Sequence, residues 1–171
     1  LTSINTILDD NSELTCRING LENKSPSRII LDKNLQIPNS SNIVKSAKKY
    51  KTIIFFNKIN KKKIKHLMNL KIKLVREPLN KNGNFDLKSI LSKIKLFGFS
   101  RIFLECGVNL TTNFLSNNLV DDFQLFISNK KLGKNGYNSF KKNMKLFLNN
   151  CNFINQKVYL FGDKLLSYKI K

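Results

Sequence analysis

With 171 residues, the chain is long enough for one domain with a substantial core and too short for two comfortable ones. Apolar residues make up 41% of it, which excludes an intrinsically disordered chain, and no apolar run approaches the ~20 residues needed to span a bilayer. The net charge of +20 suits a nucleic-acid-binding face, but scattered lysines supply most of it, which favours a solvated surface. No secretory signal opens the chain, so we expect a cytoplasmic location and no membrane partner.

Strand-like runs alternate with helical patterns, which predicts helices packed on a sheet. An apolar strand is expected at about 6–8. The runs at 28–32 and 51–56 are continuously apolar, as in strands covered on both faces, whereas 70–77 alternates apolar and basic residues like an edge or half-buried strand. The lysine-rich run at 58–66, with its lone His66, is interpreted as a solvated helix face.

The second half of the chain contains the clearest helix. Residues 85–97 place apolar side chains on one helical stripe, with Asp86 near the start and Gly98 just past the end. A strand at 101–105 and a helix from about Asn109 to Asn118 should follow. Further predictions are a strand within 120–129, a polar loop at 131–143 and a hairpin formed by 157–163 and 164–171.

Cysteines do not point to a metal or a disulfide framework. Cys16, Cys106 and Cys151 are odd in number and have no C-x-x-C spacing, so we expect thiols and no metal site.

Three stretches carry residues that the fold alone does not require. Asp9 and Asp10 precede Arg17 in "TILDDNSELTCR", and Asp32 ends a strand in "PSRIILDKNLQIP". Each has an ordinary explanation as a surface turn or cap. In "RIFLECGVNLTTN", Glu105 ends a strand just before a helix N-terminus, where backbone amides favour a phosphate. A glutamate repels an anion, so Glu105 fits better as a hydrogen-bond acceptor for a sugar or amide, although a strand-end role is equally compatible with this stretch.

Together these stretches resemble the reductase domain of the riboflavin-biosynthesis pyrimidine deaminase/reductase. The family pattern "T-V-L-A-D-D-P-x-L-T-x-R" is matched by Thr6, Ile7, Leu8, Asp10, Leu14, Thr15 and Arg17. The pattern "P-x-R-[VI]-[VI]-[LV]-D-x-x-L-x-[IL]-P" is matched from Pro26 to Pro38, and "E-[GA]-G-x-x-L-x-x-x-[FL]-L-x-x-x-L-V-D-[EF]" from Glu105 to Phe123 except at Cys106. The resemblance covers essentially the whole chain.

The resemblance implies a dihydrofolate-reductase-like fold, a three-layer α/β/α arrangement with a mixed, mostly parallel sheet and a C-terminal antiparallel hairpin. It also implies an activity: hydride transfer from NADPH to the anomeric carbon of the ring-opened ribose in 5-amino-6-(5-phosphoribosylamino)uracil, giving the ribitylamino product. Asp10 and Glu105 would be catalytic, with Leu14, Arg17 and Glu105 binding the substrate. The residues expected at the cofactor are Thr6, Asp10, Lys33, Gly107, Val108, Asn109, Leu110, Thr111, Thr112 and Asn113.

Several features depart from the family pattern. Asn11 stands where the family has a second Asp, and Cys106 replaces a small residue in the cofactor turn. The family's opening strand with "S-x-D-G", the helix after it and the zinc deaminase domain have no counterpart, so we expect a partial reductase domain spanning 1–171, inactive alone and fused to the deaminase in its parent chain. The family's habit implies a homodimer. The alternatives are another dihydrofolate-reductase-like NADPH reductase and a basic nucleic-acid-binding module.

Overall fold

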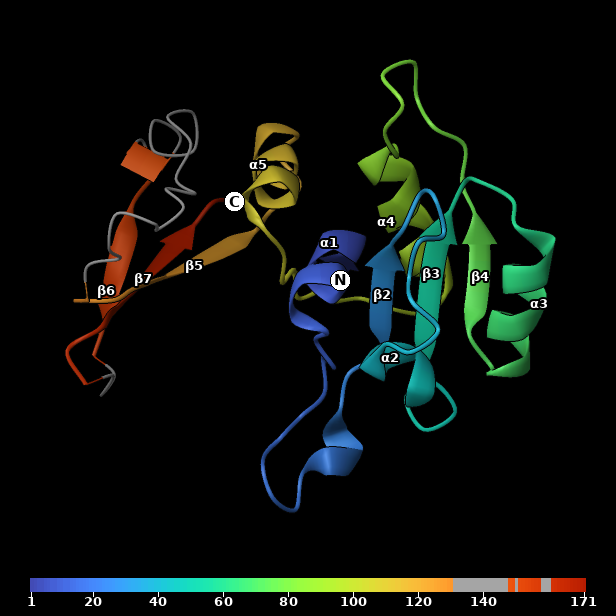
Figure 1. The fold of residues 1–171 in the computed structure, drawn as a ribbon. Coiled ribbons are helices and arrows are strands. Elements are labelled where there is room, and N and C mark those ends of the chain that lie inside the picture. Colours follow the sequence, from blue (N-terminus) through green and yellow to red (C-terminus); the bar gives the residue numbers. More distant parts are fainter. Residues whose placement is uncertain (131–147, 150, 158–160) are drawn as a thin grey trace. The chain divides into compact units, whose positions relative to one another are not determined.

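Figure 1 shows the computed structural model of the chain, which describes residues 1–130, 148–149, 151–157 and 161–171. These residues divide into two compact units, Leu1–Gly107 and Val108–Lys171, each of which is described here by itself. Along the described part of the chain, no helix has the length and apolar character needed to cross a membrane.

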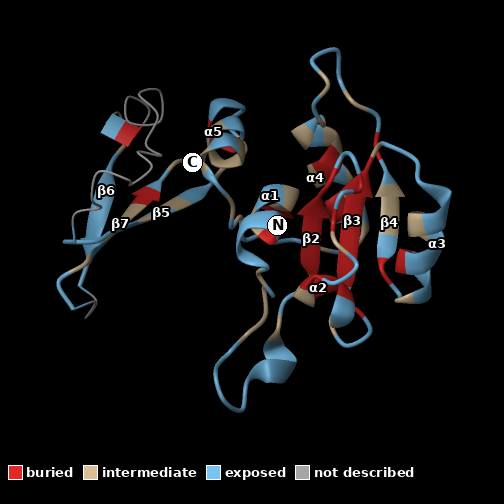
Figure 2. Cartoon of the chain, viewed as in Figure 1, coloured by how far each residue is buried: buried red, intermediate tan, exposed pale blue. Residues whose placement is uncertain are grey.

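A four-stranded parallel sheet forms the centre of the first unit. Its strands, in spatial order, are β1 (Thr2–Ser3), β2 (Arg28–Leu31), β3 (Thr52–Phe56) and β4 (Lys73–Arg76). Figure 2 shows β2 and β3 buried along their length, as their continuous apolar runs predict. At the edge of the sheet, β4 exposes both of its ends, so its predicted edge position is confirmed.

Helices cover both faces of this sheet. The helices α1 (Ile4–Asp10), α2 (Asn42–Lys45) and α3 (Lys61–Asn69) pack on one face, because buried side chains from all three join β2 and β3 in one core. The members of that core include Ile7, Ile30, Ile43, Val44, Ile54, Phe56 and Leu67. The predicted α/β/α layering is therefore present in this unit.

The other face carries α4 (Leu87–Leu96), as the apolar stripe predicts. Asp86 caps the helix by accepting a hydrogen bond from the backbone N–H of Lys88, and Gly98 has a φ of +87° just beyond the end. The ring of Phe97, at the end of α4, lies 6.4 Å from the ring of Phe55 on β3. Glu77, buried just after β4, accepts hydrogen bonds from Ser89 and Lys93 and so fixes α4 to the edge of the sheet.

The strand predicted at 6–8 is wrong. Residues 4–10 form the helix α1, and the strand before it consists of Thr2 and Ser3. Ile4, Ile7 and Leu8 have the i, i+3, i+4 spacing of a helix face, and Ile7 points into the core. In so short a run, the apolar residues favour a strand while their spacing favours a helix. Packing of Ile7 in the same core as Ile30 of β2 selects the helix.

The prediction of a strand at 101–105 also needs correction, because these residues form no regular ladder. They remain extended, with exposure that alternates from Arg101 to Glu105. Leu1 donates a hydrogen bond to the carbonyl of Phe103, at 2.7 Å, and accepts one from the N–H of Glu105, at 3.0 Å. In a parallel pair of strands, a residue bonds to the two residues on either side of the one opposite it, as Leu1 bonds to Phe103 and Glu105. Residues 103–105 therefore extend the sheet beside β1, but only through this one pair.

The second unit begins with α5 (Val108–Ser116), which confirms the helix predicted from Asn109. Its antiparallel sheet has the order β5 (Asp122–Ile127), β7 (Lys164–Lys169) and β6 (Phe153–Gln156). Leu115 of α5 packs with Leu148 and Tyr168 in its core. The predicted strand within 120–129 is therefore present.

The C-terminal hairpin is present, but its first strand lies earlier than predicted, at β6, and residues 158–160 of the predicted strand are outside the described residues. The predicted loop at 131–143 also lies outside them. The parallel and antiparallel strands of the described residues belong to two separate sheets instead of the one mixed sheet that was predicted. The α/β class with parallel strands and a C-terminal antiparallel element is confirmed.

Candidate functional site

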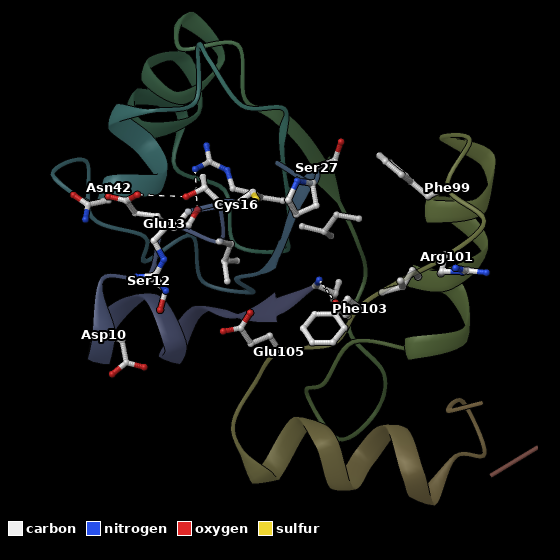
Figure 3. Close-up of a pocket in the computed structure, with 18 of the residues that line it drawn as sticks. Asp10, Ser12, Glu13, Cys16, Ser27, Asn42, Phe99, Arg101, Phe103 and Glu105 are labelled. Carbon is white, nitrogen blue, oxygen red and sulfur yellow. Dashed lines mark hydrogen bonds between the residues drawn. The ribbon is translucent and has the colours of Figure 1, made fainter. Parts of the chain in front are cut away.

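A cavity of about 780 Å³ opens at the β1 edge of the first unit. Three segments form most of its lining, namely the end of α1 with the loop after it, the start of β2, and residues 99–105, and Leu1 and Asn42 complete it. Figure 3 shows the side chains of Asp10, Glu13, Arg101 and Glu105 around this cavity. Acidic residues and arginines from positions that are distant in the sequence therefore line one cavity.

The predicted catalytic and substrate residues all line this cavity. Asp10 lies at the end of α1, Leu14 and Arg17 lie in the loop after it, and Glu105 comes from the extended segment beside Leu1. The cavity thus unites the first and third of the stretches that the sequence singled out. Their roles toward a ligand remain predictions.

The extended segment explains how Glu105 reaches the cavity. Arg101, Phe103 and Glu105 are exposed and line the hollow, while Leu104 between the last two is half-buried. Side chains two residues apart share one side of an extended chain. The hydrogen bond from the Glu105 N–H to Leu1 fixes this alternation, so Glu105 is presented on the same side as Phe103.

The order of the strands brings distant segments together at this edge. From β1 the chain proceeds outward through β2 and β3 to β4, and α4 then crosses the opposite face to bring 101–105 back beside β1. The cavity lies beside the start of β2, so its lining comes from the amino end of that strand.

Asn11 accounts for one departure from the family pattern. It ends α1 with a φ of 48°, and its side-chain oxygen accepts a hydrogen bond of 2.9 Å from the backbone N–H of Asn42, the first residue of α2. Asn42 returns a side-chain hydrogen bond to the carbonyl of Asn11. An aspartate could accept the same hydrogen bond. The side chain at position 11 fixes the loop to α2, and asparagine can do this as well as the family's aspartate.

A buried arginine holds the loop that follows α1. Arg28, at the start of β2, is 1% exposed and donates a hydrogen bond of 3.1 Å to the backbone carbonyl of Glu13. Burial lowers the pKa of the Arg28 guanidinium, against the opposing influence of Tyr50 and Glu13. Arginine nevertheless stays cationic at neutral pH, so a positive charge lies beneath the cavity wall.

Two predicted cofactor residues of the first unit lie outside the cavity lining. Thr6 is half-buried on α1, and Lys33 is exposed after β2, with its Nζ donating to the carbonyl of Gly83 at 3.1 Å. Asp32 is fully buried and accepts hydrogen bonds of 2.8 Å from the N–H groups of Gln36 and Ile37. Asp32 therefore shapes the turn, which is the structural alternative that the sequence left open.

The remaining predicted cofactor residues begin at the end of the first unit. Gly107 is its last residue, and a Cβ added there would meet nothing within 4 Å. Val108–Asn113 lie in the first two turns of α5, in the second unit. No acidic residue occupies the first turn of α5, so its N-terminal dipole is not offset from within the helix.

Sequence reasoning assigned no role to several residues of the cavity, among them Arg28, Arg101 and Phe103. The alternation of Arg101, Phe103 and Glu105 could have revealed two of them. Burial of Arg28 carries no local signal, since arginines are rarely fully buried. Within the described ranges, no three His, Cys, Asp or Glu side chains are grouped as metal ligands.

The fold and the cavity define a class: an α/β domain with a cavity, lined by charged and apolar side chains, at the edge of a parallel sheet. Comparison with known proteins is more specific. A family described as the RibD C-terminal domain matches residues 1–165, and the chain belongs to this family.

Individual relatives agree with this assignment. The riboflavin biosynthesis protein RibD of Aquifex aeolicus (strain VF5) is 34% identical over 134 residues, which cover 78% of this chain and 35% of that protein. The chain thus spans about a third of its relative's length.

Solved structures share the fold at low identity. Acinetobacter baumannii RibD, form 2, has a TM-score of 0.75 and 19% identity, covering 98% of this chain and 45% of that chain. A Thermotoga maritima protein named as a diaminohydroxyphosphoribosylaminopyrimidine deaminase and 5-amino-6-(5-phosphoribosylamino)uracil reductase has a TM-score of 0.65 and 19% identity, covering 98% and 44%. The predicted fold family is therefore confirmed.

Proposed function

We propose that the chain is the reductase part of a riboflavin-biosynthesis protein and acts on 5-amino-6-(5-phosphoribosylamino)uracil with NADPH. The observation that carries the proposal is the single cavity shared by Asp10, Leu14, Arg17 and Glu105. Membership of the RibD C-terminal domain family and the activity named for the Thermotoga maritima protein support it.

Each cavity residue has a task that suits its chemistry. Arg17 holds the substrate phosphate, because a guanidinium can donate two parallel hydrogen bonds to phosphate oxygens. Leu14 contacts the apolar surface of the substrate. Glu105 accepts hydrogen bonds from the neutral sugar or pyrimidine, and Asp10 handles a proton at the ribose.

The residues present fit a dinucleotide phosphate. The first turn of α5 has no acid to repel it, and Gly107 leaves open space where a backbone must approach a ligand closely. Gly107 and Val108–Asn113 would hold the pyrophosphate, with Thr6, Asp10 and Lys33 contacting other parts of the cofactor. When bound, NADPH supplies the hydride that is added to the anomeric carbon of the ring-opened ribose.

The chain's own contribution is mainly placement. Holding two molecules in reacting geometry can lower a barrier by about 7–11 kcal/mol. Glu105 and Arg17 fix the two ends of the substrate, and Asp10, at the end of α1, lines the same cavity.

The proposal extends to partners and location. The protein acts in the cytoplasm as a homodimer, and its parent chain carries the zinc deaminase that supplies this substrate. The combined deaminase and reductase name of the Thermotoga maritima protein supports the fusion.

Steady-state assay of the full-length protein tests the proposal. NADPH should be consumed when the ribosylamino phosphate substrate is added, and the ribitylamino product should appear in equal amount. Gly107→Glu should abolish saturable NADPH binding, because its carboxylate would occupy the phosphate position. Absence of NADPH binding combined with salt-dependent binding of arbitrary DNA would instead support the nucleic-acid alternative.

A further inference from the structure

Arg28 is buried without an acidic partner. It is 1% exposed, and the ion pairs found in the described part of the chain join Lys93 to Glu77 and Lys169 to Asp122. A buried charge is costly unless hydrogen bonds replace its water. A fully buried arginine with neutral acceptors therefore needs an explanation beyond filling space.

Every N–H of the Arg28 guanidinium has an acceptor. Nε and one terminal nitrogen donate to Thr52 Oγ1 at 3.2 and 2.8 Å, and that nitrogen also donates to the carbonyls of Ile43 and Tyr50 at 3.0 and 3.3 Å. The other terminal nitrogen donates to Ser46 Oγ at 2.8 Å and to the Glu13 carbonyl at 3.1 Å. Since arginine has five N–H donors, none remains for a ligand, and Arg28 can act on one only through its neighbours.

One of these bonds reaches the loop that carries Arg17. The Glu13 carbonyl belongs to the peptide group that precedes Leu14, and Leu14 has a φ of 53°. A leucine in the left-handed region is strained by about 1–3 kcal/mol and persists where its surroundings fix it. The bond from Arg28 fixes the peptide plane on which this φ depends.

The loop is held at its start by another element. Asn42 of α2 makes two hydrogen bonds to Asn11, whereas Arg28 joins Glu13 to the start of β2. Arg28 also donates to Ile43 of α2, to Ser46 and to the carbonyl of Tyr50, so its position is fixed by several bonds besides those to Thr52. It thus transfers the rigidity of the sheet to the residues between Glu13 and Arg17.

We propose that Arg28 is a positioning residue for the substrate loop: by bonding the Glu13 carbonyl it holds Leu14 in its left-handed conformation and directs Arg17 to the phosphate of the substrate. This inference rests on the proposed function of the cavity. The buried charge of Arg28 has a second effect, because it raises the electrostatic potential of a cavity that receives an anion.

Kinetics of the full-length protein test this role. Arg28→Lys keeps the charge but cannot bond all the same acceptors, and KM for the phosphorylated substrate should rise about tenfold with kcat changed by less than about threefold. The matched control is Thr52→Val, which also removes hydrogen bonds from Arg28 and leaves the Glu13 carbonyl in place. Its KM should stay within about twofold of the unmodified protein.

A double variant separates positioning from general loss of structure. In an Arg17→Ala background, Arg28→Lys should raise KM by less than about twofold, because the side chain that it positions is gone. Independent, multiplicative effects of the two changes would overturn the inference, as would equal KM increases in Arg28→Lys and Thr52→Val.

A second measurement does not depend on activity. Hydrogen exchange of the amides in 13–17 should be faster in Arg28→Lys than in Thr52→Val, after each is compared with amides of β3 in the same sample. Equal exchange in the two variants would refute the inference. If the unmodified protein is inactive but the two variants show the expected difference in exchange, the proposed function is refuted, whereas the role of Arg28 in holding residues 13–17 is not.

Discussion

Removing the guanidinium of Arg17 should weaken substrate binding while leaving the fold intact. Arg17 is exposed and lines the cavity, so Arg17→Ala should change the free energy of unfolding by no more than about 0.5 kcal/mol. A hydrogen bond to a charged group contributes about 1.5–3 kcal/mol, and 1.36 kcal/mol corresponds to a factor of ten. KM for the phosphorylated substrate should therefore rise about 10- to 150-fold.

The assay is the steady-state loss of NADPH at varied substrate concentration, with thermal unfolding measured on the same samples. The KM of Arg17→Lys should lie between those of the unmodified protein and Arg17→Ala, since an ammonium keeps the charge and loses the paired hydrogen bonds. Arg101→Ala removes the same charge from another wall of the cavity and is the matched control. Equal increases in KM for Arg17→Ala and Arg101→Ala, or no change in Arg17→Ala, would refute the phosphate assignment.

Three further predictions concern the cavity and its support. Glu105→Ala should lower kcat/KM about 10- to 100-fold with little change in the Kd of NADPH, measured by titration; loss of cofactor affinity alone would contradict its contact with substrate. Asn11→Ala should cost about 1 kcal/mol in chemical denaturation and Asn11→Asp less than about half of that, since aspartate retains the acceptor for Asn42; equal losses would argue against the hydrogen bond. Ile54→Ala, at a fully buried position of β3, should cost about 2–5 kcal/mol by the same method, and a loss below about 1 kcal/mol would contradict its place in the core.

Local patterns were sufficient for the elements whose signals are strong and consistent. The continuous apolar runs of β2 and β3 predict strands buried on both faces, and the stripe of α4 with Asp86 and Gly98 predicts a helix with both ends. These features need no knowledge of distant residues.

Elements that depend on a distant partner were harder to predict. Residues 4–10 carry an apolar run and a helical spacing at once, and contact with β2 decides between them. For 101–105, a strand-like sequence finds one residue, Leu1, with which to pair. The alternation of its side chains persists without a ladder, which is why Glu105 still reaches the cavity.

The candidate site was predicted in part for a similar reason. Motif matches single out the side chains proposed to touch a ligand, and four of these line one cavity: Asp10, Leu14, Arg17 and Glu105. The same matches include Arg28 but do not show that it bonds to the loop. The buried bonds of Arg28 join segments from three parts of the chain and appear only when the fold is known.

Transfer of an isotope tests the central claim most directly. The full-length protein is supplied with NADPH deuterated at the nicotinamide C4 position on the transferring side and with 5-amino-6-(5-phosphoribosylamino)uracil, and the product is examined by mass spectrometry. We expect a ribitylamino product carrying one deuterium on the carbon that was anomeric, and slower formation of this product in Glu105→Ala. A product without deuterium, or unreacted substrate in the presence of bound NADPH, would contradict it.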